Sequence, residues 1–194
     1  LWYIYTRKYY SAIKSYQMAL ACDPISAFGG IVSCNFRITK KLAIELNKIF
    51  LEVIVADGFD SESLKILKKK RNLRLIDASK MLMIDTTKFN STNESILTQS
   101  EDLKKFEIKN FKVVSKKKPS KSQLKDLVFA FNVCRYVKSN AIVLASNGAT
   151  VGIGSGQPSR LDSCQIAINK MNKFNNFNEE LVAAWGNLVQ RVFT

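Results

Sequence analysis

Apolar residues in the first third of the chain recur at spacings that alternate between helix and strand. Between Ser11 and Cys22 they follow the three-to-four-residue period of a helix with one buried face. Asp23-Pro24 ends this helix, because the residue before a proline is disfavoured in the helical region. The continuing pattern predicts strands at 31–36, 53–56 and 73–76, and helices at 40–50 and from residue 60 or 61.

The second half of the chain carries the clearest local signals. Ser120 and Gln123 have the capping-box spacing, which predicts a helix from there to about Lys138. Two apolar runs, 141–145 and 150–154, flank an Asn-Gly pair and predict a β-hairpin. Helices and strands thus alternate along most of the sequence, and the fold class expected is α/β, a layered domain with a mixed sheet.

Two segments are harder to interpret. Residues 79–110 are polar and weakly patterned, and the only strand expected there lies at 96–98. After Asn172 the composition of the sequence changes, and an amphipathic helix is expected near the end of the chain. One stripe of that helix would carry Leu181, Trp185, Leu188 and Val189.

Composition excludes several classes of protein. The 194 residues suit one globular domain, and no apolar run reaches the roughly 18–20 residues that span a bilayer, so no membrane association is expected. The sequence contains no histidine, which removes Ser-His-Asp, Cys-His and His-metal chemistry from this chain. The cysteines are far apart and predict reduced, mostly buried thiols rather than a metal or redox site. They are Cys22, Cys34, Cys134 and Cys164.

A strong positive charge favours anionic partners. Thirty basic against sixteen acidic residues give a net charge of +14, which suits nucleic acid, phosphorylated metabolites or polyglutamylated cofactors. The densest runs, 68–71 and 116–118, lie beside turns and carry no interleaved aromatic residues. A solvated face is therefore the favoured interpretation, nucleic acid is an unlikely partner, and a non-catalytic basic RNA-binding module is the alternative.

Glycines and an amide mark the candidate chemistry. The segment 152–160 has glycine at alternate positions after a strand and before a helix, where a backbone can approach an anion. Its spacing favours a structural turn and a ligand-binding turn equally. Asn140 could bind a carbonyl and Lys138 could act as an acid or an anion partner, but spacing alone favours a helix C-terminal cap for this pair.

Several ordered segments together resemble one enzyme family. Residues 23–32 read D-P-I-S-A-F-G-G-I-V, and 52–56, 137–143 and 152–160 follow in the family's order. The family is the bifunctional 5-aminoimidazole-4-carboxamide ribonucleotide (AICAR) formyltransferase and IMP cyclohydrolase of purine biosynthesis. The resemblance covers about residues 11–173.

The resemblance implies a fold and a reaction. The fold would be a cytidine-deaminase-like α/β domain without zinc, truncated at both ends. The reaction would transfer a formyl group from the co-substrate 10-formyltetrahydrofolate to the 5-amino group of AICAR, with no metal. A cytoplasmic homodimer with active sites across its interface is implied for the full-length protein.

Site residues follow from the same resemblance. The nucleotide would be contacted by Phe28, Gly29, Glu52 and Arg160. Asn140 would hold the reacting carboxamide or formyl oxygen, with Lys138 as the second catalytic residue. The folate would be bound by the backbone of Leu161 and by Gln157.

The sequence also departs from the family. The Lys-His pair of a K-H-x-N-P-C-G segment is missing, since residues 6–10 read T-R-K-Y-Y, and the S-D-A-F-F-P-F segment does not appear. Residues 1–175 are therefore interpreted as a partial formyltransferase domain, and 176–194 as an unmatched amphipathic tail, with the IMP cyclohydrolase domain absent. We expect this chain to bind substrate weakly without catalysis; a structural remnant with no activity is a further possibility.

Overall fold

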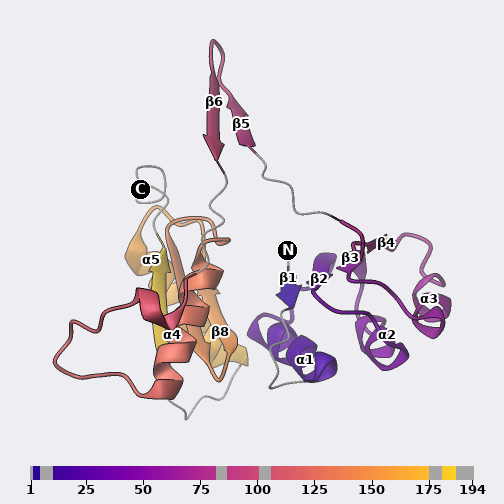
Figure 1. Cartoon of the computed structure of the whole chain (residues 1–194), viewed down its shortest axis with the longest axis horizontal. Helices are drawn as coiled ribbons and strands as arrows, with labels where there is room; N and C mark the ends of the chain where they lie inside the picture. Colours follow the sequence, from indigo (N-terminus) through magenta and orange to yellow (C-terminus); the bar gives the residue numbers. More distant parts are fainter. Residues whose placement is uncertain (1, 5–10, 82–86, 101–105, 175–180, 187–194) are drawn as a thin grey trace.

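A parallel sheet forms the N-terminal half of the protein. The computed structural model describes residues 2–4, 11–81, 87–100, 106–174 and 181–186 (Figure 1). The sheet has the strand order β1-β2-β3-β4, and helices connect consecutive strands, as parallel pairing requires. The strands are β1 (Trp2–Ile4), β2 (Gly30–Cys34), β3 (Leu51–Ala56) and β4 (Arg74–Asp77). The helices are α1 (Ala12–Cys22), α2 (Lys40–Leu46) and α3 (Ser61–Leu67).

Helix α2 ends four residues earlier than the apolar pattern predicts. Lys70, just beyond α3, donates from Nζ to the carbonyl oxygens of Asn47 at 2.8 Å and Ile49 at 2.7 Å. These bonds satisfy carbonyl groups that the end of a helix leaves without partners. The chain can therefore turn after Leu46 and enter β3 with Leu51 fully buried.

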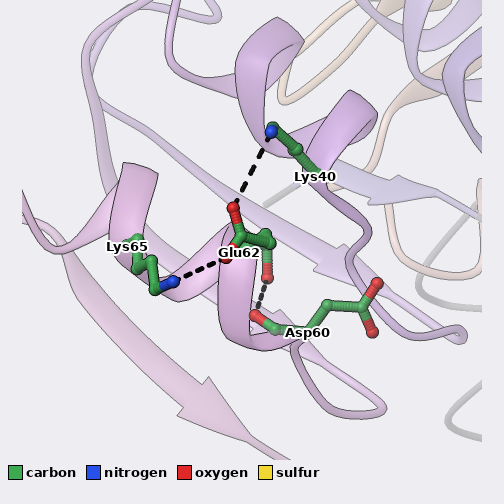
Figure 2. A network of polar contacts seen from close by, with 5 residues as sticks. Lys40, Asp60, Glu62 and Lys65 are labelled. Atoms are coloured by element: carbon green, nitrogen blue, oxygen red, sulfur yellow. Dashed lines mark hydrogen bonds and ion pairs between the residues drawn. The ribbon is translucent and has the colours of Figure 1, made fainter.

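Figure 2 shows a second contact between α2 and α3, at the surface. Glu62 lies between Lys65 of its own helix, at 2.6 Å, and Lys40 of α2, at 3.7 Å. All three side chains are largely exposed, so solvent screening makes this network a small contribution to stability. The two helices are held mainly by buried apolar residues, among them Leu42, Leu46 and Leu67.

An antiparallel sheet forms the C-terminal half. Its strand order is β8-β7-β9, with α4 and α5 packed on it. The elements are α4 (Lys121–Cys134), β7 (Ala141–Ser146), β8 (Ala149–Gly154), α5 (Arg160–Phe174) and β9 (Val182–Gly186). The predicted capping box at Ser120 and Gln123 is confirmed, with both reciprocal hydrogen bonds present.

The predicted β-hairpin is confirmed as β7 and β8. Asn147 and Gly148 both adopt positive φ angles, 50° and 72°, as a tight two-residue hairpin turn requires. The side chain of Asp126 in α4, which is only 7% exposed, accepts hydrogen bonds from both turn amides, at 2.9 and 2.7 Å. One buried carboxylate thus fastens the hairpin turn to the helix.

The prediction of a helix near the end of the chain is wrong for the residues that the structure describes there. Residues 182–186 form β9, which pairs antiparallel with β7. Val182 and Ala184 point into the core shared with α4, and the alternation of buried positions has a period of two. The strand pairs with the edge of β7 that β8 does not occupy. Leu188 and Val189, the other residues of the expected stripe, lie outside the described residues.

The middle of the chain holds one strand more than expected. Strands β5 (Thr87–Ser91) and β6 (Ile96–Ser100) form a hairpin that projects away from both sheets (Figure 1). Every residue of the two strands is exposed, so the weak apolar pattern had no buried face to reveal. A short 3₁₀ helix, Ile108–Asn110, follows, and the rings of Phe106 and Phe111 both pack edge-on against Phe131 of α4.

The two halves meet through α1, which packs against β8. At the end of α1, Asp23 is 6% exposed and its carboxylate lies 2.7 Å from Nζ of Lys170 in α5. The same carboxylate accepts a hydrogen bond from the backbone N–H of Ser26 at 3.0 Å. Burial alone would raise the pKa of Asp23, but the bonds from Lys170 and Ser26 hold it below its ordinary value.

The α/β class is therefore confirmed, but in place of the mixed sheet expected, parallel and antiparallel strands lie in separate sheets. The four cysteines, all among the described residues, form no disulfide, and burial raises the pKa of the Cys34 thiol to about 12, which keeps it protonated. Among the helices that the structure describes, none combines the length and hydropathy needed to cross a bilayer.

Replacing Asp126 should destabilise the C-terminal half. Asp126→Ala leaves the amides of Asn147 and Gly148 without this acceptor, and we expect a loss of about 1–3 kcal/mol in the free energy of unfolding. Urea unfolding monitored by circular dichroism measures it. Asp57→Ala, at an exposed position, is the matched control. An equal loss in both variants would contradict the role of Asp126 as the turn anchor.

The pair of Asp23 and Lys170 should make stability depend on acid pH. Because the native pKa of Asp23 lies below the value of about 3.9 for an unfolded chain, ionised Asp23 stabilises the fold above that pH. This stabilisation is lost as pH falls through the native pKa. We expect Asp23→Asn to lower the melting temperature by about 2–4 °C at neutral pH, and the difference to shrink in acid. A difference that is constant from pH 7 to about pH 2.5 would refute the assignment.

Candidate functional site

An open cavity lies where β7 begins and α5 begins. Its volume is about 630 Å³, and it is lined by Ser139, Asn140 and the consecutive residues 157–161. Ser139 and Asn140 directly precede β7, whereas 157–161 complete the glycine-rich loop after β8 and start α5. Of the predicted site residues, the structure brings Asn140, Gln157, Arg160 and Leu161 together around this cavity.

The side-chain amide of Asn140 is fixed by the loop opposite it. Its Nδ2 donates to the carbonyl oxygens of Gln157 at 3.0 Å and Pro158 at 2.9 Å. The two carbonyls determine the orientation of the amide, since an oxygen in the place of Nδ2 would face two acceptors. Both Nδ2 hydrogens are used in this way, so the group that Asn140 can offer a ligand is the acceptor Oδ1.

Asn140 is not the C-terminal cap that its spacing favours. Helix α4 ends at Cys134, with Arg135 at the cap position, six and five residues before Asn140. The backbone of Asn140 instead bonds to the glycine-rich loop and to α5. Its N–H donates to the carbonyl of Gln157 at 3.2 Å, and its carbonyl accepts from the hydroxyl of Ser163 in α5 at 2.7 Å.

The glycines of the loop have a structural role. A Cβ atom on Gly152 would overlap the backbone carbonyl oxygen of Ala167, and one on Gly154 would overlap that of Ser163. Both glycines therefore let α5 pack directly on β8. Gly156 has φ +68°, which favours glycine, and its N–H donates to the carbonyl of Lys138 at 2.7 Å. Close packing and turn geometry account for all three.

Ser159 lies at the rim of the cavity, directly before α5. Its hydroxyl accepts hydrogen bonds from the N–H groups of Leu161 at 3.1 Å and Asp162 at 3.4 Å. Serine is a preferred residue at helix N-caps, and Ser159 has this role here. The side chain of Leu161 is 81% exposed at the same rim.

One basic residue, Arg160, lines the cavity, and a second, Lys138, lies against the loop beside it. Arg160 is the first residue of α5, and its guanidinium carbon lies 4.5 Å from the ring centroid of Trp185 in β9. The side-chain carbons of Lys138 lie against Gly156, with the closest 3.6 Å from where a Cβ would stand. Trp185 is a residue that sequence reasoning missed as a neighbour of the site, because it was expected to lie on a helix.

Phe28, Gly29 and Glu52 form a separate cluster on the N-terminal half. The N–H of Gly29 donates to the carbonyl of Phe50 at 2.9 Å, and the ring of Phe28 lies 5.2 Å from that of Phe50. A Cβ on Gly29, whose φ is +71°, would lie 3.8 Å from Oε1 of Glu52. Phe28 is 74% exposed. Among the described residues, no hydrogen bond, ion pair or ring contact joins this cluster to the cavity at Asn140.

The cavity can bind a polar, anionic ligand. It offers one fixed acceptor, Oδ1 of Asn140, backbone groups of the glycine-rich loop and the positive charge of Arg160. The part of the chain that the structure describes contains no group of three or more His, Cys, Asp or Glu side chains placed to hold a metal ion. The acceptor of Asn140 and the charge of Arg160 point to recognition by hydrogen bonds and charge.

The anchoring role of Asn140 can be tested directly. Asn140→Ala removes two hydrogen bonds to the loop, and we expect a loss of about 1–3 kcal/mol in unfolding free energy. The N–H of Gly156 should also exchange faster with deuterium. The loop is held to residues 138–140 by this N–H and by the side chain of Asn140, so losing one contact should weaken the other. Asn72→Ala, at an exposed position, is the control. Unchanged exchange at Gly156 would show that the loop does not depend on the amide.

Comparison with known proteins gives consistent matches. The sequence model of a family described as AICARFT/IMPCHase bienzyme matches residues 8–170. Relatives named bifunctional purine biosynthesis protein PurH are similar to this chain. The one from Rhodospirillum rubrum is 47% identical over 161 residues, which cover 81% of this chain and 30% of the relative. The one from Petrotoga mobilis is 45% identical over 160 residues, 82% of this chain and 31% of the relative.

A third relative extends the match slightly. The PurH of Leuconostoc mesenteroides is 42% identical over 171 residues, which cover 88% of this chain and 34% of the relative. The chain thus spans about a third or less of the length of these curated relatives. The matched region of the family model contains the cavity and the Phe28 cluster, and β9 lies beyond its last residue.

Proposed function

Because this chain belongs to the AICARFT/IMPCHase bienzyme family, we propose that it serves the AICAR formyltransferase reaction of purine biosynthesis. In that reaction the 5-amino nitrogen of AICAR attacks the formyl carbon of 10-formyltetrahydrofolate. A new C–N bond forms, the bond from the formyl carbon to N10 breaks, the amine loses a proton and N10 gains one. The products are formyl-AICAR and tetrahydrofolate.

The fixed amide of Asn140 is the observation that carries this proposal. An aromatic amine is a weak nucleophile, so the site must orient it and accept its N–H. Asn140 lines the cavity, and the two bonds that Nδ2 makes to the loop leave Oδ1 as its acceptor for a ligand. We assign Asn140 the role of accepting a hydrogen bond from the substrate, in place of the oxygen-holding role that the resemblance implies.

Charge supports binding of the remaining ligand groups. AICAR carries a phosphate and the folate carries glutamate carboxylates. Arg160 lines the cavity, and Lys138 lies against Gly156 of the neighbouring loop. The proposed folate contacts are Gln157 and the backbone of Leu161, both at the cavity rim. The net charge of +14 also favours the encounter with anionic substrates.

A complete site would need a second copy of the chain. Phe28, Gly29 and Glu52, the remaining proposed nucleotide contacts, form their own cluster, and no described contact joins it to the cavity at Asn140. This separation supports the homodimer implied by the resemblance, with one copy contributing each cluster. Free cysteines are consistent with a reducing cytoplasmic location, which belongs to the same proposal.

Turnover by this chain alone is not expected. The sequence has no histidine, and the Lys-His pair of the family is missing. Without a proton acceptor suited to neutral pH, the amine cannot be deprotonated efficiently. We therefore propose that this chain binds AICAR and positions it but does not by itself catalyse formyl transfer.

Isothermal titration with AICAR tests the proposal. Lys138→Gln should weaken AICAR binding about tenfold, the effect of losing roughly 1.4 kcal/mol from a charged contact. Lys41→Gln removes the same charge from an exposed position of α2 and should leave the affinity nearly unchanged. Formyl transfer from 10-formyltetrahydrofolate should stay at background in the wild type and in both variants.

The alternative, a basic RNA-binding module, predicts a different result. It requires an RNA mobility shift that weakens steeply with salt, together with no AICAR binding. The comparisons give this alternative no support, and Lys70 of the run 68–71 is engaged with backbone carbonyls. RNA binding without AICAR binding would overturn the proposed function, as would an equal effect of the Lys138 and Lys41 substitutions.

A further inference from the structure

We infer that Trp185 is a positioning residue of the cavity: its indole ring supports the guanidinium of Arg160 and so presents the N–H groups of that side chain to an oxyanion on the ligand. The inference rests on the proposed function, because it takes the cavity at Asn140 as the ligand site. It adds a residue that the family match does not contain, since the match ends at residue 170.

The sheet register puts Trp185 on the face of the sheet where Arg160 contacts it. Trp185 lies directly opposite Ile142 of β7, and side chains of such a pair share one face of the sheet. Ile142 packs in the cluster on the α5 face, whereas the neighbouring Ala184 packs in the cluster with α4. Helix α5 covers β8 and β7 on this face. Arg160, its first residue, lies over the indole at 4.5 Å.

Stacking leaves the N–H donors of the guanidinium available to a ligand. The group is planar, and its five N–H donors lie in that plane, so a ring against one face does not compete for them. Within the described residues, no carboxylate is paired with Arg160. The donors can therefore bind a phosphate or a carboxylate in two-pronged fashion, and holding the plane still lowers the entropy lost on binding.

The tryptophan is itself held by packing and strand pairing. Its indole Nε1 is buried and has no hydrogen-bond partner among the described residues, so no polar contact fixes the ring. The position of the ring depends on β9 being paired with β7. The strand at the end of the described chain thus has a defined part in the site: it supplies the surface on which Arg160 rests.

Binding measurements on four proteins test the inference. They are the wild type, Trp185→Leu, Arg160→Met and the double variant, each titrated with AICAR and, separately, with folic acid. We expect Trp185→Leu to lower the affinity for one of the two ligands about 2- to 30-fold, the range of a cation–π contact. Trp185→Phe, which keeps an aromatic face, should recover part of that loss.

The double variant separates positioning from general destabilisation. If Trp185 acts through Arg160, adding Trp185→Leu to Arg160→Met should cause no further loss of affinity. The ligand that is affected identifies the oxyanion: AICAR offers a phosphate, and folic acid offers glutamate carboxylates. AICAR riboside, which lacks the phosphate, should be insensitive to both substitutions if the phosphate is the partner.

A ligand-free measurement keeps the inference separable from the proposed function. In a Trp2→Phe background, Trp185 is the one tryptophan of the sequence. Arg160→Met should then shift its emission and increase its quenching by acrylamide, whether or not AICAR or folic acid binds. Failure of both ligands to bind the wild type would overturn the proposed function and the ligand-binding part of this inference. Additive losses in the double variant, no loss with Trp185→Leu, or unchanged Trp185 fluorescence would overturn the positioning role.

Discussion

Direct packing of helix α5 on strand β8 is the constraint on which the candidate site depends. Glycines at 152 and 154 leave room for backbone carbonyls of the helix, and any side chain there would overlap them. This contact sets where α5 begins, and hence where Arg160 and Leu161 stand relative to Asn140. The hydrogen bonds from Asn140 to Gln157 and Pro158 then close the loop over the start of β7.

The halves of the molecule are coupled at the other end of the same helix. Asp23 ends α1 and binds Lys170 of α5, while its carboxylate also accepts the N–H of Ser26 in the turn that leads to Phe28. Helix α5 thus contacts the cavity through its first turn and the Phe28 turn through its third. One helix therefore connects the cavity to the turn before Phe28.

Local chemistry was enough to predict many elements. The capping box at Ser120 and the Asn147-Gly148 turn are each specified by at most four neighbouring residues, and both predictions are confirmed. Elements whose pattern depends on distant partners were missed. The strand β5 has no buried face, α2 is cut short by Lys70 from beyond α3, and β9 forms because β7 has an open edge. The predicted division at residue 175 stays a prediction, although β9 beyond it joins the core sheet.

By itself, the sequence determined the α/β class, the family and the segments that line the cavity, because ordered motifs and local turn chemistry are written in neighbouring residues. Tertiary structure decided what those residues can do. It turned Asn140 from an expected helix cap into an anchored acceptor, gave the glycines a packing role and placed Trp185 beneath Arg160. These outcomes depend on contacts between residues 9 to 25 positions apart, and no local pattern specifies such contacts.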